Sequence, residues 1–126
     1  RSAKPMSEAD VERFLAQGGV HLFVFRPDTA DAEGNRPILG MLSLATFEIP
    51  TGVRAWVEDV VVDEAARGHG AGQSLVVAAI EHAKKVGART VDLTSRPSRE
   101  AANRLYQRAG FKLRETNVYR VTLEQK

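Results

Sequence analysis

Residues 53–87 constrain the fold more than any other part of the sequence, because strand, corner and helix patterns follow one another there. "VRAWVEDVVV" (53–62) is rich in β-branched residues and predicts a buried strand. "ARGHGAG" (66–72) follows and carries three alternating glycines. Apolar residues then recur at helical spacing over 73–86, and Gly87 is typical of a helix C-cap. A glycine-rich corner between a strand and a helix indicates a phosphate-binding site, because the first N–H groups of the helix are unpaired.

The segment before the corner predicts a short helix and then an antiparallel meander. The helix pattern "SEADVERFLAQGG" begins with a capping box formed by Ser7 and Asp10. Strand patterns occupy 20–25, 38–49 and 53–62, joined by the polar loop "RPDTADAEGNRP" and the turn "PTG". Short links between consecutive strands favour antiparallel pairing.

The segment after the corner predicts a β-α-β unit. The strand "RTVDLTS" (89–95) is reached through a helix, which implies parallel pairing with the strand before the corner. A second helix pattern occupies 98–110, and "FKLRE" (111–115) and "VYRVTL" (118–123) predict two final strands. We therefore expect one α/β domain over residues 1–126, in which a mixed sheet combines an antiparallel meander with a β-α-β unit and carries helices on both faces.

The composition excludes several classes of function. Hydrophobic residues make up 43% and charged residues 27%, which is ordinary for a soluble globular protein. The absence of cysteine excludes disulfides, thiolate metal ligands and a cysteine nucleophile. The net charge of +2, with basic and acidic residues interspersed, argues against a nucleic-acid partner. There is no bilayer-length apolar run and no signal-peptide pattern, so we expect a cytoplasmic protein with no membrane partner and no metal site.

Three kinds of phosphate site begin with such a corner. A Walker A loop needs a lysine after its last glycine, where this chain has Gln73, which argues against ATP hydrolysis. A dinucleotide fingerprint needs a third glycine at that same position and a doubly wound sheet, and the sequence offers neither. The spacing Arg67-x-x-Gly70-x-Gly72 matches the signature Q/R-x-x-G-x-G/A, whose backbone N–H groups bind a pyrophosphate. A tight corner without any ligand is the structural alternative.

On two segments the chain resembles the GCN5-related N-acetyltransferase (GNAT) family. They are "VEDVVVDEAARGHGAG" and "LTSRPSREAANRLYQRAGF", and the resemblance covers residues 7 to about 123. The first segment also resembles a stretch of glucosamine-6-phosphate N-acetyltransferases. Members of the family usually begin with a strand and a helix that this chain does not have before Ser7. The resemblance therefore implies a GNAT-like domain that is incomplete at its N-terminus.

The resemblance implies that acetyl-CoA is the acetyl donor. Its pyrophosphate would lie on the loop 67–72, and its pantetheine arm in a gap between the strand 53–62 and the next parallel strand. Arg99 stands where many members carry an asparagine that binds the pantetheine. The alternatives are that Asn103, one helical turn before Tyr106, replaces this contact, or that Arg99 reaches the 3′-phosphate of the donor. The residues implied in donor binding are Val60, Val61, Val62, Arg67, Gly68, His69, Gly70, Ala71, Gly72, Gln73, Asn103 and Tyr106.

The resemblance also implies that an acceptor amine attacks the thioester directly, without a covalent enzyme intermediate. Tyr106, in "LYQRAGF", stands where many members have the tyrosine that protonates the CoA sulfur. Glu58 is the preferred general base and Asp59 the other candidate, because a carboxylate within an apolar strand is costly unless it is paired or functional. A backbone N–H near Val60 or Val61 would stabilise the oxyanion. The structural alternatives are a core aromatic for Tyr106 and a cross-strand salt bridge for Glu58.

We therefore expect an N-acetyltransferase that acts on a primary amine of a small molecule or a peptide. A non-catalytic acyl-CoA-binding regulatory module stays open, because it would need the loop but neither Tyr106 nor Glu58. A nucleotide-binding domain that uses the same corner is a third alternative. Family members often pair through their later strands, so a homodimer is a further implication of the resemblance.

Overall fold

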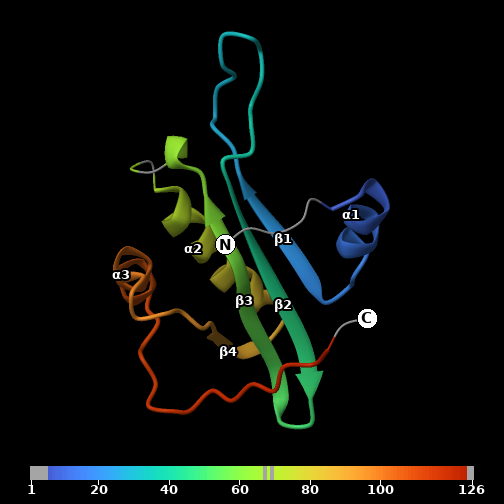
Figure 1. Ribbon diagram of the computed structural model, residues 1–126, viewed down its shortest axis with the longest axis vertical. Coiled ribbons are helices and arrows are strands. Elements are labelled where there is room, and N and C mark those ends of the chain that lie inside the picture. Colours follow the sequence, from blue (N-terminus) through green and yellow to red (C-terminus); the bar gives the residue numbers. More distant parts are fainter. Residues whose placement is uncertain (1–5, 67, 69, 125–126) are drawn as a thin grey trace.

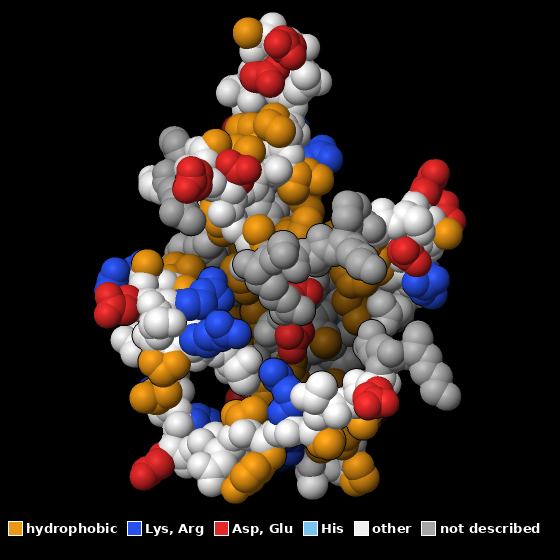
Figure 2. All heavy atoms as spheres, in the orientation of Figure 1, with side chains coloured by type: hydrophobic (Ala, Val, Ile, Leu, Met, Phe, Trp, Pro, Cys, Tyr) orange, Lys and Arg blue, Asp and Glu red, His pale blue; other side chains and the backbone are white. Residues whose placement is uncertain are grey.

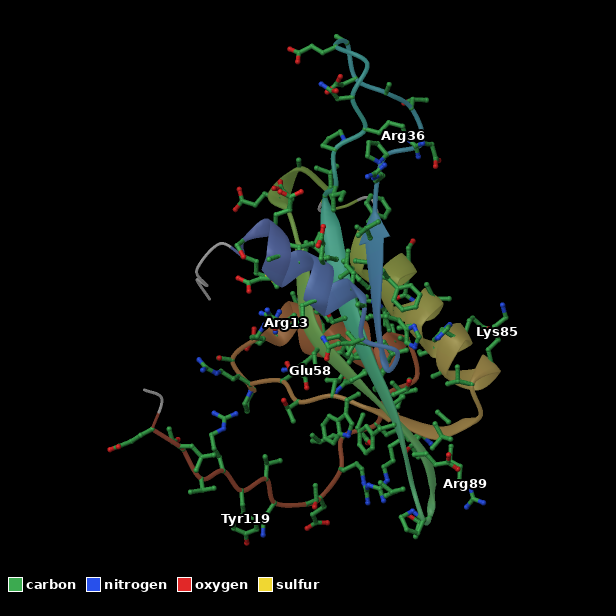
Figure 3. The ribbon with its side chains drawn as sticks, turned by 90° about the vertical axis from the view of Figure 1, so that its right-hand side faces the viewer. Arg13, Arg36, Glu58, Lys85, Arg89 and Tyr119 are labelled. Atoms are coloured by element: carbon green, nitrogen blue, oxygen red, sulfur yellow. The ribbon has the colours of Figure 1, made fainter. Side chains whose placement is uncertain are left out.

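The computed structural model describes residues 6–66, 68 and 70–124 and contains a four-stranded mixed sheet with helices on both faces (Figure 1). α1 covers one face and α2 the other, as the side view in Figure 3 shows. None of the helices in the described ranges is long and apolar enough to cross a membrane. The elements in chain order are α1 (Glu8–Leu15), β1 (Val20–Phe25), β2 (Gly40–Ile49), β3 (Gly52–Val62), a 3-10 turn (Glu64–Ala66), α2 (Ala71–Lys85), β4 (Ala88–Asp92) and α3 (Glu100–Arg108).

α1 begins at the predicted capping box. The Asp10 N–H donates to Ser7 Oγ, and the Ser7 N–H donates to Asp10 Oδ2, each at 3.2 Å. Arg13 also bonds Asp10, at 2.6 Å, and the hydrogen bonds from Ser7 and then from Arg13 lower the pKa of that carboxyl. α1 has no buried residue, so its N-terminus is defined by the capping box rather than by packing against the core.

The sheet has the predicted topology, with strand order β1-β2-β3-β4. β1 pairs antiparallel with β2, and β2 pairs antiparallel with β3 across the turn at Pro50 and Thr51. β4 pairs parallel with β3 after the chain has crossed over through α2. The antiparallel meander and the β-α-β unit are therefore both confirmed.

The core lies between the sheet and α2. Strand side chains alternate between the two faces, and on β2 and β3 one set is buried against the helix. The other set on β3, which includes Arg54, Trp56 and Glu58, therefore faces away from α2. The buried residues of the core cluster are Leu42, Leu44, Ala55 and Val57 from the strands, Leu75, Val76, Ala79 and Ala83 from α2, and Tyr106 from α3.

The two strands predicted over 111–115 and 118–123 are wrong, because the described residues 111–124 form no strand. This segment runs below β4 and past the turn between β2 and β3 in Figure 1. Hydrophobic side chains gather along the lower edge of the molecule in Figure 2. An alternating pattern favours a strand locally, but a strand also needs a partner edge for its N–H and C=O groups. The exposed apolar side chains of the segment are Leu113 (94%), Val118 (73%), Tyr119 (87%), Val121 (81%) and Leu123 (76%).

Candidate functional site

The corner between β3 and α2 has the geometry of an anion site. Gly70 is the N-cap residue of α2, with φ 73° and ψ 18°, and Gly68 has φ 84°. No atom lies within 4 Å of a Cβ built at either glycine, so the space beside the backbone is open. No side chain caps α2, and its first turn carries no acidic residue. An uncapped helix N-terminus presents unpaired N–H groups and the positive end of the helix dipole, so the corner can bind an anion.

Two residues of the expected loop, Arg67 and His69, lie outside the described residues. Their roles in binding the pyrophosphate stay predictions. The described members of the loop are Gly68 and the residues from Gly70 onward. Gly68 and Gly70 have the left-handed conformation, and α2 begins directly after Gly70.

β3 and β4 pair over only part of their length. Their last pair is Trp56 with Asp92, whereas β3 continues to Val62. Beyond that pair, β3 has no pairing with β4 within the described part of the chain. The gap that was expected between the two strands stays a prediction. Val60 and Val62 of this stretch pack against the core, and Val61 is exposed.

Glu58 and Asp59 lie at a bulge in β3. Ser43 of β2 pairs with Glu58 and Met41 pairs with Val61, so β3 holds an extra residue, and Asp59 has a positive φ of 49°. Bulges frequently lie next to active sites because they re-aim side chains. Both side chains are exposed, and Glu58 lies on the side of the sheet that carries α1 (Figure 3). The regular alternation that would separate Glu58 and Asp59 onto opposite faces is interrupted here.

Tyr106 is the buried residue of α3, with 6% of its surface exposed. Its ring packs edge-on against Phe111, with ring centroids 6.0 Å apart, and its carbonyl accepts a 2.9 Å hydrogen bond from the Phe111 N–H. Among the described residues we find no hydrogen bond to its hydroxyl. The ring is thus a core aromatic, and the proton-donor role of its hydroxyl stays a prediction.

The first turn of α2 lies close to α3. Ala71 is buried, and a Cβ added at Gly72 would lie 2.9 Å from Leu105 Cδ2, so this glycine allows the two helices to approach. Gln73 follows, and its Oε1 is buried without a hydrogen-bond partner. A buried carbonyl oxygen without a donor is costly, and a ligand that carries amide N–H groups would satisfy it.

The loop after β4 contains a residue that sequence reasoning missed. The hydroxyl of Ser95 is buried without a partner, three positions beyond the last β3–β4 pair. Asn103, expected to bind the pantetheine, donates its amide to the Arg96 carbonyl at 3.0 Å and so holds this loop. Arg99 is exposed at the start of α3. A single serine after a strand is a weak signal in a sequence, and only its burial draws attention to it.

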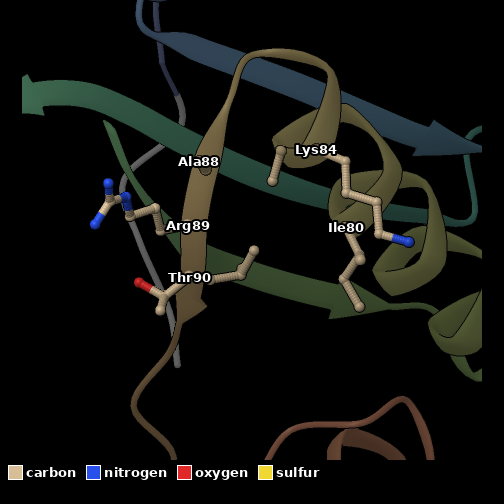
Figure 4. Close-up of a pocket in the computed structure, with 7 residues that line it drawn as sticks. Ile80, Lys84, Ala88, Arg89 and Thr90 are labelled. Atoms are coloured by element: carbon tan, nitrogen blue, oxygen red, sulfur yellow. The ribbon is translucent and has the colours of Figure 1, made fainter. Parts of the chain in front are cut away.

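Two cavities of the described residues lie away from the corner. One of about 240 Å³ lies at the beginning of β3 and β4, where Arg54, Arg89 and Arg114 line it together with Asp92. The corner joins the opposite end of β3 to α2, so neither cavity is the expected donor site. The other, of about 150 Å³, lies between α2 and β4 (Figure 4) and is lined by Ile80, Ala83, Lys84, Ala88, Arg89, Thr90 and Val91.

The structure also brings together two histidines that the sequence does not connect. The rings of His21 on β1 and His82 on α2 have their centroids 4.2 Å apart, and Phe23 packs edge-on against His82. The Nε2 atom of His82 is buried without a partner. Burial, and then the neighbouring His82, lower the pKa of His21. The pair lies where the edge of the sheet meets α2, so it bears on packing rather than on the donor site.

The β-α-β unit, the glycine corner and the uncapped start of α2 coincide with a match to one protein family. A family model described as "Acetyltransferase (GNAT) family" matches residues 2–111 of this chain. The chain belongs to this family. No curated protein sequence matches this GNAT chain.

Solved structures of known proteins share the GNAT fold. A structure described as a transcriptional regulator from Bacillus halodurans is 30% identical, with a TM-score of 0.73, and the match covers 97% of this chain and 81% of that one. An acetyltransferase of Trypanosoma brucei is 27% identical, with a TM-score of 0.75 and coverages of 96% and 83%. An aminoglycoside acetyltransferase from an uncultured soil sample, in complex with trehalose, is 19% identical, with a TM-score of 0.80 and coverages of 98% and 79%. The last of these shows likeness of fold alone.

Proposed function

We propose that this chain is an acetyl-CoA-dependent N-acetyltransferase, which moves an acetyl group to a primary amine by direct attack within a ternary complex. One observation carries the proposal: β3 loses its pairing with β4 at Trp56 and continues toward the glycine corner paired with β2 but not with β4. The side of β3 that lacks pairing with β4 thus leads to the positive end of α2, which suits a ligand with an amide-bearing arm and a pyrophosphate.

The residues fit acetyl-CoA as the donor. Backbone groups of Val60 and Val62 would bond the arm, and the N–H groups from Gly70 to Gln73 would bind the pyrophosphate, with Arg67 and His69 beside them. The buried atoms Gln73 Oε1 and Ser95 Oγ, which have no hydrogen-bond partner among the described residues, support a polar ligand near the start of α2 and the loop after β4. Asn103 would contribute through its carbonyl oxygen, because its amide is engaged by the loop.

The reaction forms a C–N bond and breaks the C–S bond of the thioester. A neutral amine is needed, so we propose that Glu58 takes the amine proton through water, with Asp59 as the alternative base. A backbone N–H at Val60 or Val61 stabilises the oxyanion, and Tyr106 donates a proton to the departing thiolate. The exposure of Glu58 and the unpaired hydroxyl of Tyr106 support these roles.

The acceptor class we propose is a primary amine of a small molecule or a peptide. Two structures of similar fold, described as an aminoglycoside acetyltransferase and a glucosamine-6-phosphate N-acetyltransferase, point to amino sugars as the first compounds to test. The proposal includes a cytoplasmic location, and it includes neither a nucleic acid nor a membrane as a partner. A panel of aminoglycosides, amino-sugar phosphates and peptides, followed by release of free CoA, identifies the acceptor.

Tyr106→Phe tests the chemistry, and Tyr119→Phe is its matched control. The variant keeps the buried ring and removes a hydroxyl without a partner in the described chain, so we expect normal folding and normal acetyl-CoA binding. Turnover is expected to fall about 10²- to 10⁴-fold, the usual contribution of a general acid. Tyr119 is 87% exposed, and its variant should behave like the unmodified chain. Unchanged turnover in Tyr106→Phe would remove this residue from the mechanism.

A second candidate function is a non-catalytic acyl-CoA-binding regulatory module. It is favoured by the 30% identity to the structure described as a transcriptional regulator. Titration calorimetry with acetyl-CoA, CoA, ATP and NAD, together with the acceptor panel, separates the two functions. Tight binding of acetyl-CoA without CoA release for any amine supports the module, and tightest binding of ATP or NAD contradicts both functions.

A further inference from the structure

The cavity of about 240 Å³ at the beginning of β3 and β4 collects three arginines that the proposed acetyl transfer does not use. Arg54 comes from β3, Arg89 from β4 and Arg114 from the segment after α3. One carboxylate, that of Asp92, lies among them. Within the described part of the chain, none of these four side chains forms a hydrogen bond or an ion pair. Their charges therefore converge on one cavity without a direct contact that neutralises them.

A bulge in β4 brings Arg89 to this cavity. Val53 pairs with Ala88 but Arg54 pairs with Thr90, so β4 holds one extra residue at Arg89. Regular alternation would point Arg89 and Thr90 to opposite faces, whereas Figure 4 shows both side chains leaving β4 on the side away from α2. A bulge re-aims a side chain in this way. The irregular pairing thus directs Arg89 toward the cavity that Arg54 lines.

The remaining wall of the cavity offers backbone and hydroxyl groups. A Cβ built at Gly52 would lie 3.6 Å from both Cδ and Nε of Arg89, so the arginine side chain passes over the start of β3. Thr51 and Thr90 line the same cavity and carry hydroxyl groups. Guanidinium groups are donors only, and hydroxyl groups can donate as well. The lining is therefore suited to a ligand that presents several acceptor oxygens.

The charges of the lining residues indicate which oxygen anion fits. Three arginines and one aspartate leave the cavity with a net charge of +2, because its other lining residues are uncharged. A phosphate monoester carries about −1.5 to −2 near neutral pH and presents three acceptor oxygens. A phosphodiester carries a single negative charge and would leave half of the positive charge unbalanced. The planar fork of arginine also binds phosphate through two parallel hydrogen bonds.

The cavity is far from the glycine corner. β3 extends from Gly52 at the cavity to Val62 before the corner, which is roughly 30 Å at the rise of a strand. A pyrophosphate at the corner is therefore not the anion that the cavity would hold. Glu58 lies four residues from Arg54, or about 13 Å along β3, so a small phosphate ester in the cavity does not reach the proposed base. The cavity is thus a second site.

We propose that this cavity binds the phosphate group of a small phosphate monoester. Arg54 and Arg89 donate to the phosphate oxygens from two neighbouring strands, and Arg114 donates from the segment after α3. Asp92 reduces the charge of the site to that of one dianion, which selects against polyphosphates. The inference goes beyond the proposed acetyl transfer and does not depend on it.

The first test is titration calorimetry with methyl phosphate and dimethyl phosphate, a monoester and a diester of similar size. We expect one saturable site for methyl phosphate and at least about 10-fold weaker binding of dimethyl phosphate. Binding of methyl phosphate should weaken as the pH falls through about 6, where the monoester takes up a proton. No histidine lines the cavity, and sulfate, which stays a dianion, serves as the control. Equal affinities for the two esters, or no saturable binding, overturn the proposal.

The second test locates the site with variants. Arg54→Gln and Arg114→Gln should each bind methyl phosphate about 10- to 100-fold more weakly, the effect of losing a charge-assisted hydrogen bond. Arg36→Gln is the matched control, because Arg36 is exposed on the loop at the opposite end of the molecule from Arg89 (Figure 3). Asp92→Asn should strengthen binding, since it removes a repulsive charge, and a purely structural role of the carboxylate would not produce that direction.

The same variants separate this site from the glycine corner. Arg54 and Arg114 are exposed, so their variants should keep the melting temperature of the unmodified chain. They should also keep its affinity for acetyl-CoA, measured on the same samples. If methyl phosphate binds both arginine variants as tightly as the unmodified chain, the phosphate lies elsewhere, and the assignment of the cavity is wrong. A failure of the unmodified chain to bind acetyl-CoA would contradict the proposed function alone.

Discussion

The glycine corner yields a sharp prediction, because α2 has a left-handed glycine at each end. Gly70, at its start, has φ 73°, and Gly87, just after its end, has φ 84°. A Cβ built at either position meets no atom within 4 Å. Alanine therefore causes no clash at either site, and its cost is that of a left-handed L residue, about 1–2 kcal/mol. For a chain of this size the melting temperature should fall by about 4–8 °C in both variants.

The two variants should differ in donor binding. If N–H groups at Gly70 bind the pyrophosphate, a methyl group there displaces it and removes at least one charge-assisted hydrogen bond, worth about 1.5–3 kcal/mol. Gly70→Ala should thus bind acetyl-CoA about 10- to 100-fold more weakly, and Gly87→Ala should bind it normally. Titration calorimetry and thermal melting measure both quantities on the same samples. Equal affinities for the two variants would refute the assignment of the corner as the phosphate site.

Three further predictions concern the core, the histidine pair and the base. Leu44→Ala, at a fully buried position, should lower the free energy of unfolding by about 2–5 kcal/mol in urea, whereas Leu113→Ala, at a 94% exposed position, should change it by less than about 0.5 kcal/mol. The pKa of His21 is lowered on folding, so the unfolded chain binds its proton first and stability should fall as the pH drops below about 7; His21→Phe should flatten this fall in a series of urea melts. Glu58→Gln should lose most turnover at the lower end of a pH–rate profile, where the acceptor amine is protonated, and an equal loss in Asp59→Asn but not in Glu58→Gln would move the base to Asp59.

The elements that local periodicity describes were predictable. The strand expected at 20–25 is β1, and the helix expected over 73–86 is α2, within two residues at its start. α2 has one buried face, and β1 packs Phe23 and Phe25 against the core from one side, and a single core-facing side produces a regular pattern in the sequence. Parallel pairing of β4 followed from the helix between the two strands, because a parallel connection needs a crossover.

The end of the chain was not predictable from its own pattern. Residues 118–123 alternate as strands do, but pairing depends on which edge lies within reach. That is decided by where α3 ends and by the course past Arg114, neither of which leaves a mark in the segment itself. The alternating pattern indicates a local preference for an extended strand. Within the described residues of the chain, this segment pairs with no other strand.

Part of the candidate site could likewise be predicted from the sequence, and part could not. The left-handed conformation of Gly68 and Gly70 could be expected from the sequence of the corner, since few residues other than glycine accept that conformation. The bulge at Asp59 could not be predicted from the neighbouring residues. It arises because the register between β2 and β3 shifts between Met41 and Ser43 of β2. Aspartate tolerates a positive φ better than most residues, but nothing in "VEDVVV" indicates that the strand will need one.

The proposed reaction implies a direction from which the acceptor approaches. Because α2 packs on one face of the sheet, we expect the acceptor to reach a donor bound beside β3 from the opposite face, which carries Glu58. Thr90 and Asp92 share that face through their pairing with Arg54 and Trp56.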